Sequence, residues 1–560
     1  MRNRLTRTPG VFLVACSGWL LTVFLILPSA QGGAERRPTR TAVHDNLSLF
    51  THSENCAACH NNLSTTAGED VSIGASWRST MMANSGRDPY WQAGVRREVT
   101  DHPKHSAAIQ DECAGCHMPM STRVLRADGG LGQVFAHLPI SASDRSPLHR
   151  LASDGISCSV CHQIAPDTLG TPASFNGRFV LDGPGKAPRA MFGPYAVDRG
   201  RQTIMRSVTG FTQAEAPHVK DSELCASCHT LITQAFGPGG EVIGSLPEQM
   251  NYQEWQRSDF PREQRSCQSC HMPRVAGPVR VASVLGETRD GLSRHLFVGG
   301  NAFMVRMLAR YRTDLAVEAL EPELEATAAA TVRQLQTETA ELSISPPAAT
   351  GGQLSFDVRL RNLTGHKLPT GYPARRVWLH VTVRDSQGRT VFESGALDDT
   401  GAIRGNDGDA DDRAFEPHFE EIARPEDVQI YEAVLGDRAG APTTGLLSAV
   451  RYLKDTRLLP RGFDKRTADP TIAVYGGAVD DADFAGGGDV TRYRVAVSTS
   501  GPYQVTAEAR YQSIGYRWAH NLERYQAPEP ARFLRYYNAD AAGSSVVVAT
   551  ASASTGGSSK

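Results

Sequence analysis

The stretch "CSVCH", from Cys158 to His162, repeats a pattern that sets the character of the chain. In this pattern two cysteines stand three positions apart, and a histidine follows the second at once. We number the copies as the first to fifth motifs in chain order, so that CSVCH is the third. The other four are Cys56-Ala-Ala-Cys59-His60, Cys113-Ala-Gly-Cys116-His117, Cys225-Ala-Ser-Cys228-His229 and Cys267-Gln-Ser-Cys270-His271.

The C-x-x-C-H spacing has a chemical reason. Two thiols at this spacing attach a haem covalently, and the adjacent histidine becomes the proximal ligand of the iron. Paired cysteines also occur in disulfides and in zinc ribbons, but neither needs a histidine directly after every pair. Of the 11 cysteines, only Cys16 lies outside the motifs. The sequence therefore predicts five covalent haem c groups, with these proximal ligands: His60, His117, His162, His229 and His271.

The ligand on the other face of each iron decides what a haem can do. An iron with two protein ligands transfers electrons, whereas one with an open position can bind and transform a small molecule. The chain has 17 histidines, so the supply beyond the proximal ones is ample. Their places relative to the motifs favour five distal candidates, and "WRSTMMA" adds a methionine that could instead only fill a core. The candidates are His105, His149, His218, His295, His366 and Met82.

The N-terminus has the pattern of an export signal. Arginines precede an apolar run from Val11 to Leu27, and small residues follow it. Residues 1–34 are therefore predicted to be a cleaved signal peptide or a retained N-terminal anchor, which would allow membrane association. Either outcome predicts a periplasmic or cell-surface protein. The net charge of -2 argues against nucleic acid as a partner.

Composition and periodicity predict an α+β multidomain chain. The motifs indicate a pentahaem domain over 35–300, mostly helix and loop around haem faces. A helical linker is expected over 301–345, with a break near Pro322. Period-two alternation in "QLSFDVRLRN" and "RVWLHVTVRD" predicts an antiparallel β-sandwich over 346–540. The Ser/Ala/Gly-rich segment 541–560 is expected to be a flexible tail.

Three loops of the cysteine-free half stand out. The acidic stretches 405–413 and 480–484 could bind calcium, although neither has EF-hand spacing and both could simply be solvated. The loop "TGHKLPTGYPARR", 364–376, is longer than a hairpin needs. It carries His366, which makes this histidine a distal ligand that the β-domain could donate. Arg375 and Arg376 are suited to pairing with haem propionates.

The five motifs, the pairing of "CHMP" with "CSVCHQI", and the β-domain that follows them resemble the multihaem c-type cytochromes. The resemblance is to the group that contains the tetrahaem cytochrome of hydroxylamine-oxidation chains. It implies covalent haem, mainly bis-histidine ligation and electron transfer. One departure concerns a "W-x-x-S-x-H" element of that group, where this chain offers Met81 or Met82 instead of histidine.

These features favour an electron carrier over an enzyme, and no catalytic side chain is predicted. Its partners would be redox proteins, or a membrane quinol oxidase or acceptor. A reductase or oxidase of a small nitrogen or sulfur compound is the alternative, although the C-x-x-C-K site typical of pentahaem nitrite reductases is absent from the sequence. A subunit of an extracellular haem filament is a third reading.

Overall fold

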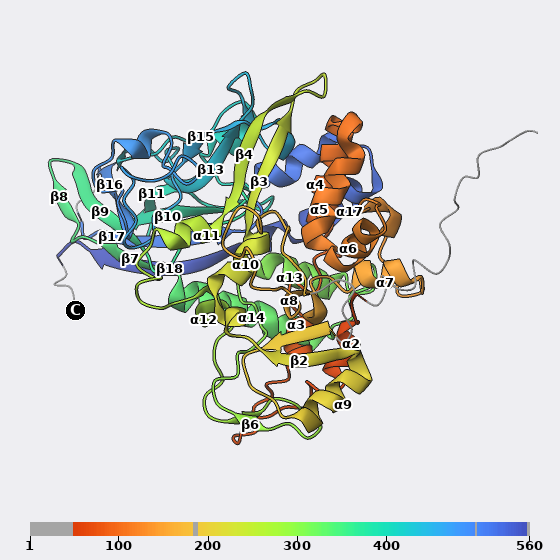
Figure 1. The fold of residues 1–560 in the computed structure, drawn as a ribbon. Coiled ribbons are helices and arrows are strands. Elements are labelled where there is room, and N and C mark those ends of the chain that lie inside the picture. The colour runs from red at the N-terminus through yellow and green to blue at the C-terminus, as the bar shows by residue number, and fades with distance from the viewer. Residues whose placement is uncertain (1–48, 183–188, 499–500, 557–560) are drawn as a thin grey trace, which may run out of the picture.

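The computed structural model describes residues 49–182, 189–498 and 501–556. The predicted signal or anchor segment, 1–34, lies outside these residues. Among the described residues no helix is long and apolar enough to span a bilayer. Short helices and small strand pairs form one side of the molecule, and two larger β-sheets form the other (Figure 1).

The motif-bearing half consists of short elements. Its helices are α2 (Ser53–Ala57), α3 (Ile73–Arg78), α4 (Pro89–Asp101), α5 (Ser106–His117), α6 (Pro119–Ala127), α7 (Pro147–Ser153), α8 (Cys158–Cys161), α9 (Arg199–Thr209), α10 (Ser222–His229), α11 (Asn251–Gln256) and α12 (Cys267–His271). Its strands pair as β1 (Arg189–Gly193) with β2 (Phe211–Glu215), β3 (Thr230–Phe236) with β4 (Val242–Met250), and β5 (Val279–Arg280) with β6 (Thr288–Arg289). Proline begins several of these helices, because its missing N–H costs nothing in a first turn.

Two helices connect this half to the sheets. They are α13 (Ala302–Arg310) and α14 (Glu321–Glu338). Pro322 lies in the first turn of α14, where the sequence predicts a break. The helical segment ends earlier than expected, since a strand begins at Ala340, inside the predicted linker 301–345.

The second half contains two packed sheets. One has the path β14-β13-β10-β17-β18, with β11 and β15 at its side, and the other has β12-β16-β9-β7, with β8. Their bounds are β7 (Ala340–Ile344), β8 (Ala348–Thr350), β9 (Gln353–Asn362), β10 (Arg376–Arg384), β11 (Thr390–Ser394), β12 (Glu421–Ile422), β13 (Ile430–Gly436), β14 (Pro442–Thr443), β15 (Arg451–Asp455), β16 (Gly488–Ala496), β17 (Gln504–Gln512) and β18 (Ser545–Ser554). Most pairs are antiparallel, and β12 with β16 is parallel.

Alternation decides which side chains form the core between these sheets. Leu354, Phe356, Val358 and Leu360 on β9 are buried, while the residues between them are more exposed. They pack with apolar side chains of β10, β16 and β17 in one large cluster. The period-two pattern thus places one face of each strand in the core, as predicted. The α+β fold class is confirmed.

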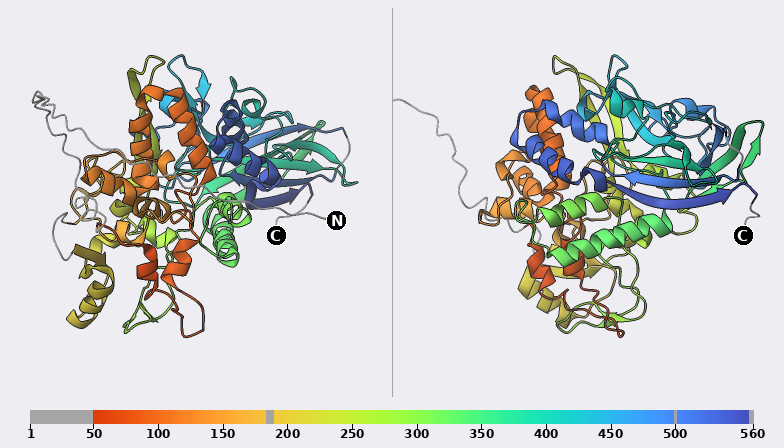
Figure 2. Two further views of the ribbon diagram at one scale, coloured as in Figure 1. Left: turned by 90° about the vertical axis from the view of Figure 1, so that its right-hand side faces the viewer. Right: turned by 180° about the vertical axis from the view of Figure 1, so that it is seen from behind.

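The C-terminal segment differs from the prediction. Residues 541–560 were expected to be a flexible tail, but Ser545–Ser554 form β18, which pairs along nearly all of β17. The prediction is therefore wrong for the described part of this segment, because Val, Ala, Ser and Thr in alternation suit a strand despite the low-complexity composition. β18 lies beside α14 (Figure 2). The preceding helices α16 (Tyr516–His520) and α17 (Pro528–Asp540) return to the first half, where α17 packs on α4.

Among its described residues, the first half has no single apolar cluster as large as the one between the sheets. Its buried side chains divide into several small clusters, such as one around Met120 and Phe179 and another around Val71 and Val275. Residues of the motif-bearing helices take part in two of the clusters, Ala114 in one and Val160 in another. Such an organisation is expected where a bound group supplies much of the buried apolar surface.

Candidate functional site

All five motifs lie on or directly beside a helical turn. The second, fourth and fifth end α5, α10 and α12, the third forms α8, and the first begins within α2. Residues three apart lie on one face of a helix, so both thiols of a motif project together. All ten motif cysteines are half-buried, and among the described residues none of them forms a disulfide.

Cysteines of different motifs also meet. The side chains of Cys56 and Cys158 lie close enough to interact, and the pKa of Cys56 is lowered while that of Cys158 is raised. Cys116 of the second motif and Cys228 of the fourth are close in the same way, and so are Cys225 of the fourth and Cys267 of the fifth. These contacts divide the motifs into two groups, the first with the third, and the second, fourth and fifth together.

Four of the five proximal histidines are oriented by a main-chain carbonyl. The Nδ1–H of His60 donates to Val281 O at 2.7 Å, and that of His162 donates to Phe192 O at 2.6 Å. His117 donates in the same way to Ser85 O at 3.3 Å, and His271 donates to the carbonyl of Val298. A bond at Nδ1 leaves Nε2 free, which is the arrangement of histidines that bind metals.

Two of these rings face a second histidine. The ring centres of His271 and His366 lie 6.2 Å apart with planes 12° from parallel, and those of His162 and His295 lie 6.3 Å apart at 21°. Imidazole nitrogen binds a metal ion at about 2.0 Å, so two rings on opposite sides of one ion have centres about 6 Å apart. Both pairs fit an iron between them.

The facing histidines share the orientation of the proximal ones. The Nδ1–H of His295 donates to Ser293 O at 3.0 Å, and that of His366 donates to Lys367 O at 2.9 Å. Burial lowers the pKa of His295 to about 3 and that of His366 to about 4. Both rings are therefore neutral near pH 7, which is the form that coordinates a metal.

The other distal candidates lie elsewhere. His105 stacks on Phe236, and its Nε2 contacts Gly240 O at 2.7 Å. The Nε2 of His218 lies in hydrogen-bond contact with Ile164 O at 2.8 Å. In both rings the nitrogen that would bind iron is occupied by a carbonyl.

His149 and Met82 also have local partners. The Nε2 of His149 accepts from Ser141 N at 3.1 Å, and Met82 follows α3 in a turn where its carbonyl accepts from Ile156 N. Among the described residues, no ring contact places a second histidine opposite His60, His117 or His229. His117 instead has Trp91 stacked on its ring, with centres 4.4 Å apart.

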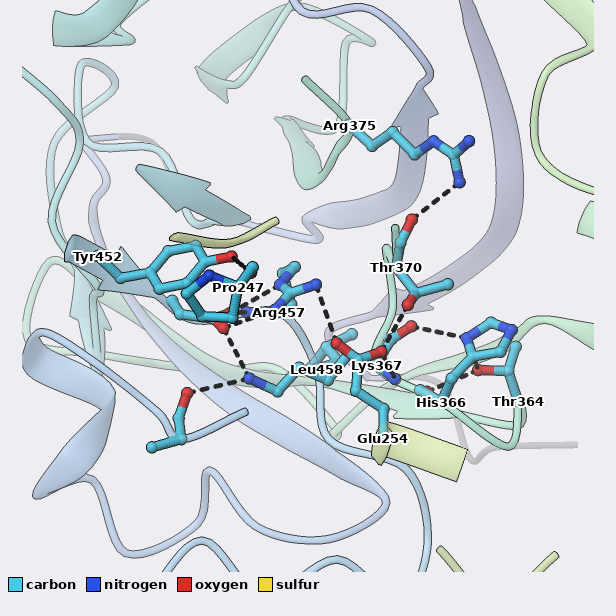
Figure 3. A network of polar contacts seen from close by, with 12 residues as sticks. Pro247, Glu254, Thr364, His366, Lys367, Thr370, Arg375, Tyr452, Arg457 and Leu458 are labelled. Atoms are coloured by element: carbon cyan, nitrogen blue, oxygen red, sulfur yellow. Dashed lines mark hydrogen bonds and ion pairs between the residues drawn. The ribbon is translucent and has the colours of Figure 1, made fainter. Parts of the chain in front are cut away.

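The loop that carries His366 is held by a buried ionic network (Figure 3). Glu254 on α11 accepts from Lys367 N at 3.1 Å and from the hydroxyl of Thr370, and it pairs with Arg457 at 3.0 Å. The Lys367 ammonium lies 2.7 Å from Asp455, which Arg457 also contacts. Although burial opposes ionisation, Arg457 and Lys367 lower the pKa of Asp455 to about 2.

Close packing completes the position of this loop. A Cβ at Gly365 would lie 2.6 Å from the ring of Phe260, so only glycine allows the loop to approach that ring. Phe260 belongs to the segment between α11 and the fifth motif. The loop therefore contacts the motif-bearing half on both sides of His366.

The two arginines at the end of the loop have different roles. Arg376 is buried and pairs with Asp409 at 2.8 Å, so the sheet domain uses its charge internally. The expectation that it pairs with haem propionates is wrong for this residue. The side chain of Arg375 donates to the carbonyl of Thr370 at 2.8 Å, and no ion pair joins it to a carboxylate of the described residues.

The acidic loops also serve internal contacts. Asp409 of the first holds Arg376, and Asp481 of the second accepts from His418 Nε2 at 2.8 Å. His418, Asp481 and Asp489 offer ligand atoms within 4.8 Å of one another. Gln429 bonds both His418 and Asp489. Calcium binding at these loops stays a prediction.

The sequence analysis missed the residues that support the site. Glu254, Asp455 and Arg457 are far from His366 in the chain, and no motif marks them. A buried charge leaves no periodic signal in a single sequence. Only their packing around Lys367 identifies them.

Comparison with known proteins shows which fold this chain has. Neither the family models nor the curated proteins contain a match to this chain. A solved structure does match, the crystal structure of a penta-heme cytochrome c552 from Thermochromatium tepidum. The match has a TM-score of 0.52 at 17% identity and covers 90% of this chain and 99% of that one. The chain has the fold of a multihaem c-type cytochrome. The match spans nearly the whole chain and is not confined to the motif-bearing half.

Proposed function

We propose that the chain is a multihaem c-type cytochrome that binds five haems covalently and transfers electrons outside the cytoplasm. The observation that carries the proposal is that a second histidine lies opposite the motif histidine at both the third and the fifth motif. Each provides two neutral imidazoles at the spacing that a six-coordinate iron requires. Haem c bound there supplies reversible one-electron chemistry.

The contacts between motifs support transfer from haem to haem. Cysteine side chains of the first and third motifs lie close together, as do those of the second and fourth and those of the fourth and fifth. Cys161 of the third also lies close enough to Cys225 of the fourth for their charges to interact. The proximal rings repeat this order, with His60 near His162, and His229 near both His117 and His271. The fourth motif is thus the junction of the group.

Export and redox partners belong to the same proposal. Covalent haem and the N-terminal pattern both suit a periplasmic or cell-surface protein. Protein redox partners, or a membrane quinol oxidase or acceptor, would supply and remove the electrons.

The intact mass of the protein purified from a host that matures cytochromes c tests the haem number. We expect the apoprotein mass plus five haems, and each Cys-to-Ala double variant of one motif should lose one haem. A mass with fewer than five in the wild type would contradict the proposal. Electron transfer is tested by stopped-flow reduction, where all haems should equilibrate within one protein molecule.

A second function, reduction or oxidation of a small nitrogen or sulfur compound, has one observation in its favour. At the second motif Trp91 stacks on the proximal ring, and no histidine of the described residues lies across from it. Buried carboxyl groups also lie near Cys113, and burial raises the pKa of one of them, Glu248, to about 8. Carbon monoxide binding to the reduced protein would favour this function, whereas wholly low-spin haem that ignores carbon monoxide would exclude it.

A further inference from the structure

Arg375 is a cation without a counter-ion beside the motifs. Its Nη1 donates to Thr370 O at 2.8 Å, and no carboxylate of the described residues lies within ion-pair distance of it. The neighbouring buried arginines differ, since Arg376 pairs with Asp409 and Arg457 with Asp455 and Glu254. A guanidinium has five N–H donors in a fork, so most of the donors of Arg375 are left over.

Two further polar groups with free capacity surround Arg375. A Cβ at Gly371 would lie 3.2 Å from Arg375 Nη1 and 3.4 Å from Asn251 Nδ2, so guanidinium and amide lie side by side. The Oδ1 of Asn251 has no hydrogen-bond partner, but it is an acceptor, so the Nδ2 beside Arg375 is the atom of this amide that can donate to an anion. The hydroxyl of Tyr511 is buried without a partner as well, and a Cβ at Gly300 would collide with it. Buried polar groups are normally paired, so the unpartnered hydroxyl of Tyr511 marks a place for a further acceptor.

This place lies between the fourth and fifth motifs. Gly300 stands two positions after Val298, whose carbonyl orients the His271 ring. Burial lowers the pKa of His229 to about 4, and the charges of His271 and Arg375 act in the same direction. Arg375 also acts on His366 and on Tyr511. The guanidinium of Arg375 therefore lies near His229 of the fourth motif and near His366, the ring that faces His271 of the fifth.

We propose that Arg375, Tyr511 and Asn251 form an anion-binding site between the fourth and fifth motifs, which takes a carboxylate or a small oxyanion. The inference rests on the proposed haem attachment. A guanidinium fork binds such planar anions through two parallel hydrogen bonds, and the phenol and amide add two donors. The anion is either a haem propionate or a free ion of the nitrite or sulfite type.

Spectroelectrochemical titration of the intact cytochrome separates these sources. If a propionate occupies the site, Arg375→Gln leaves a buried carboxylate without its counter-charge, and its pKa rises into the working range. The potential of one or two haems then falls and becomes pH-dependent between about pH 5 and 8, whereas the wild type stays flat there. If a free oxyanion binds, nitrite or sulfite changes the visible spectrum of the wild type saturably, and Arg375→Gln weakens binding at least tenfold.

One control variant and one second test variant accompany Arg375→Gln. Arg494→Gln removes an equal charge from an exposed arginine that pairs with Glu421, and it should leave potentials and spectra unchanged. Tyr511→Phe removes only a hydroxyl without a partner, so it carries the test if Arg375→Gln does not retain its haems. We expect it to show the same effect more weakly. Potentials and anion binding as in the wild type, with five haems retained in the tested variant, would overturn the inference. Fewer than five haems in the wild type would count against the proposed function instead.

Discussion

The third and fifth motifs differ from the other three in what faces the proximal ring. His162 and His271 each have a second imidazole opposite, whereas His60, His117 and His229 have none among the described residues. The facing rings come from outside the motifs, His295 from a loop after the fifth and His366 from the sheet domain. Closure of an iron site in this chain therefore depends on packing between distant segments, and the motifs alone do not provide it.

The largest expected effect comes from removing a facing ring. His366→Ala and His295→Ala should each convert one low-spin haem in five to high spin and open it to carbon monoxide, because each iron loses one axial ligand. Electron paramagnetic resonance and the visible spectrum measure this. His105→Ala and His218→Ala are the matched controls and should leave the spin state unchanged. An unaltered spectrum for His366→Ala would mean that the fifth motif does not differ from the three motifs that have no facing histidine ring.

The network behind His366 should matter nearly as much for stability. Glu254→Gln keeps the shape but leaves Arg457 and Lys367 with Asp455 alone, so the free energy of unfolding should fall by about 3 kcal/mol. Because Glu254 also holds the amide of Lys367, the fifth site should gain a partial high-spin signal while the third does not. Denaturant unfolding and the haem spectrum check both parts. Arg361→Ala, which removes a surface pair with Glu341, should cost under about 1 kcal/mol.

The pH dependence of stability should report the buried carboxyl near the second motif. Burial raises the pKa of Glu248 to about 8, above its ordinary value. The folded protein therefore holds this proton more tightly than the unfolded chain, and stability is lost as pH rises from about 4.5 to 8. Glu248→Gln should flatten this part of the profile, by an amount on the order of a few kcal/mol. A profile unchanged by the substitution would show that Glu248 ionises freely.

The smallest effect is expected at the start of the loop. The hydroxyl of Thr364 donates to His366 O at 2.9 Å and also contacts Asn362. Thr364→Val should cost about 1 kcal/mol, the usual net value of one hydrogen bond. The spectrum of the fifth site should stay low-spin, since Glu254 and Phe260 still hold the loop. A high-spin signal in this variant would mean that the loop is fixed mainly by its own turn.

Sequence reasoning was most effective where a pattern is local. The C-x-x-C-H copies lie within a few residues, so their helical turns and paired thiols follow from spacing. Alternation likewise placed β9 and β10. The same reasoning was wrong for Ser545–Ser554, where low-complexity composition hid a strand that is stabilised by pairing with β17.

Distal ligation shows the limit more clearly. His105, His149 and His218 were favoured because they precede motifs in the chain, yet their Nε2 atoms contact carbonyl or amide groups elsewhere. His295 and His366 were also named, but nothing in the sequence says which proximal ring each one faces. That assignment depends on packing between segments that are far apart in the chain.

The sequence by itself determined the five C-x-x-C-H motifs and the alternation of the sheet domain, because these depend on neighbours within one turn or one strand. Only the tertiary structure decided that His366 faces His271 and that Arg376 forms an ion pair with Asp409. It also decided that Arg375 lies between the fourth and fifth motifs. The reason is physical. The position of a ligand or a charge relative to a distant group is set by the packing of whole elements, and a single sequence does not record that packing.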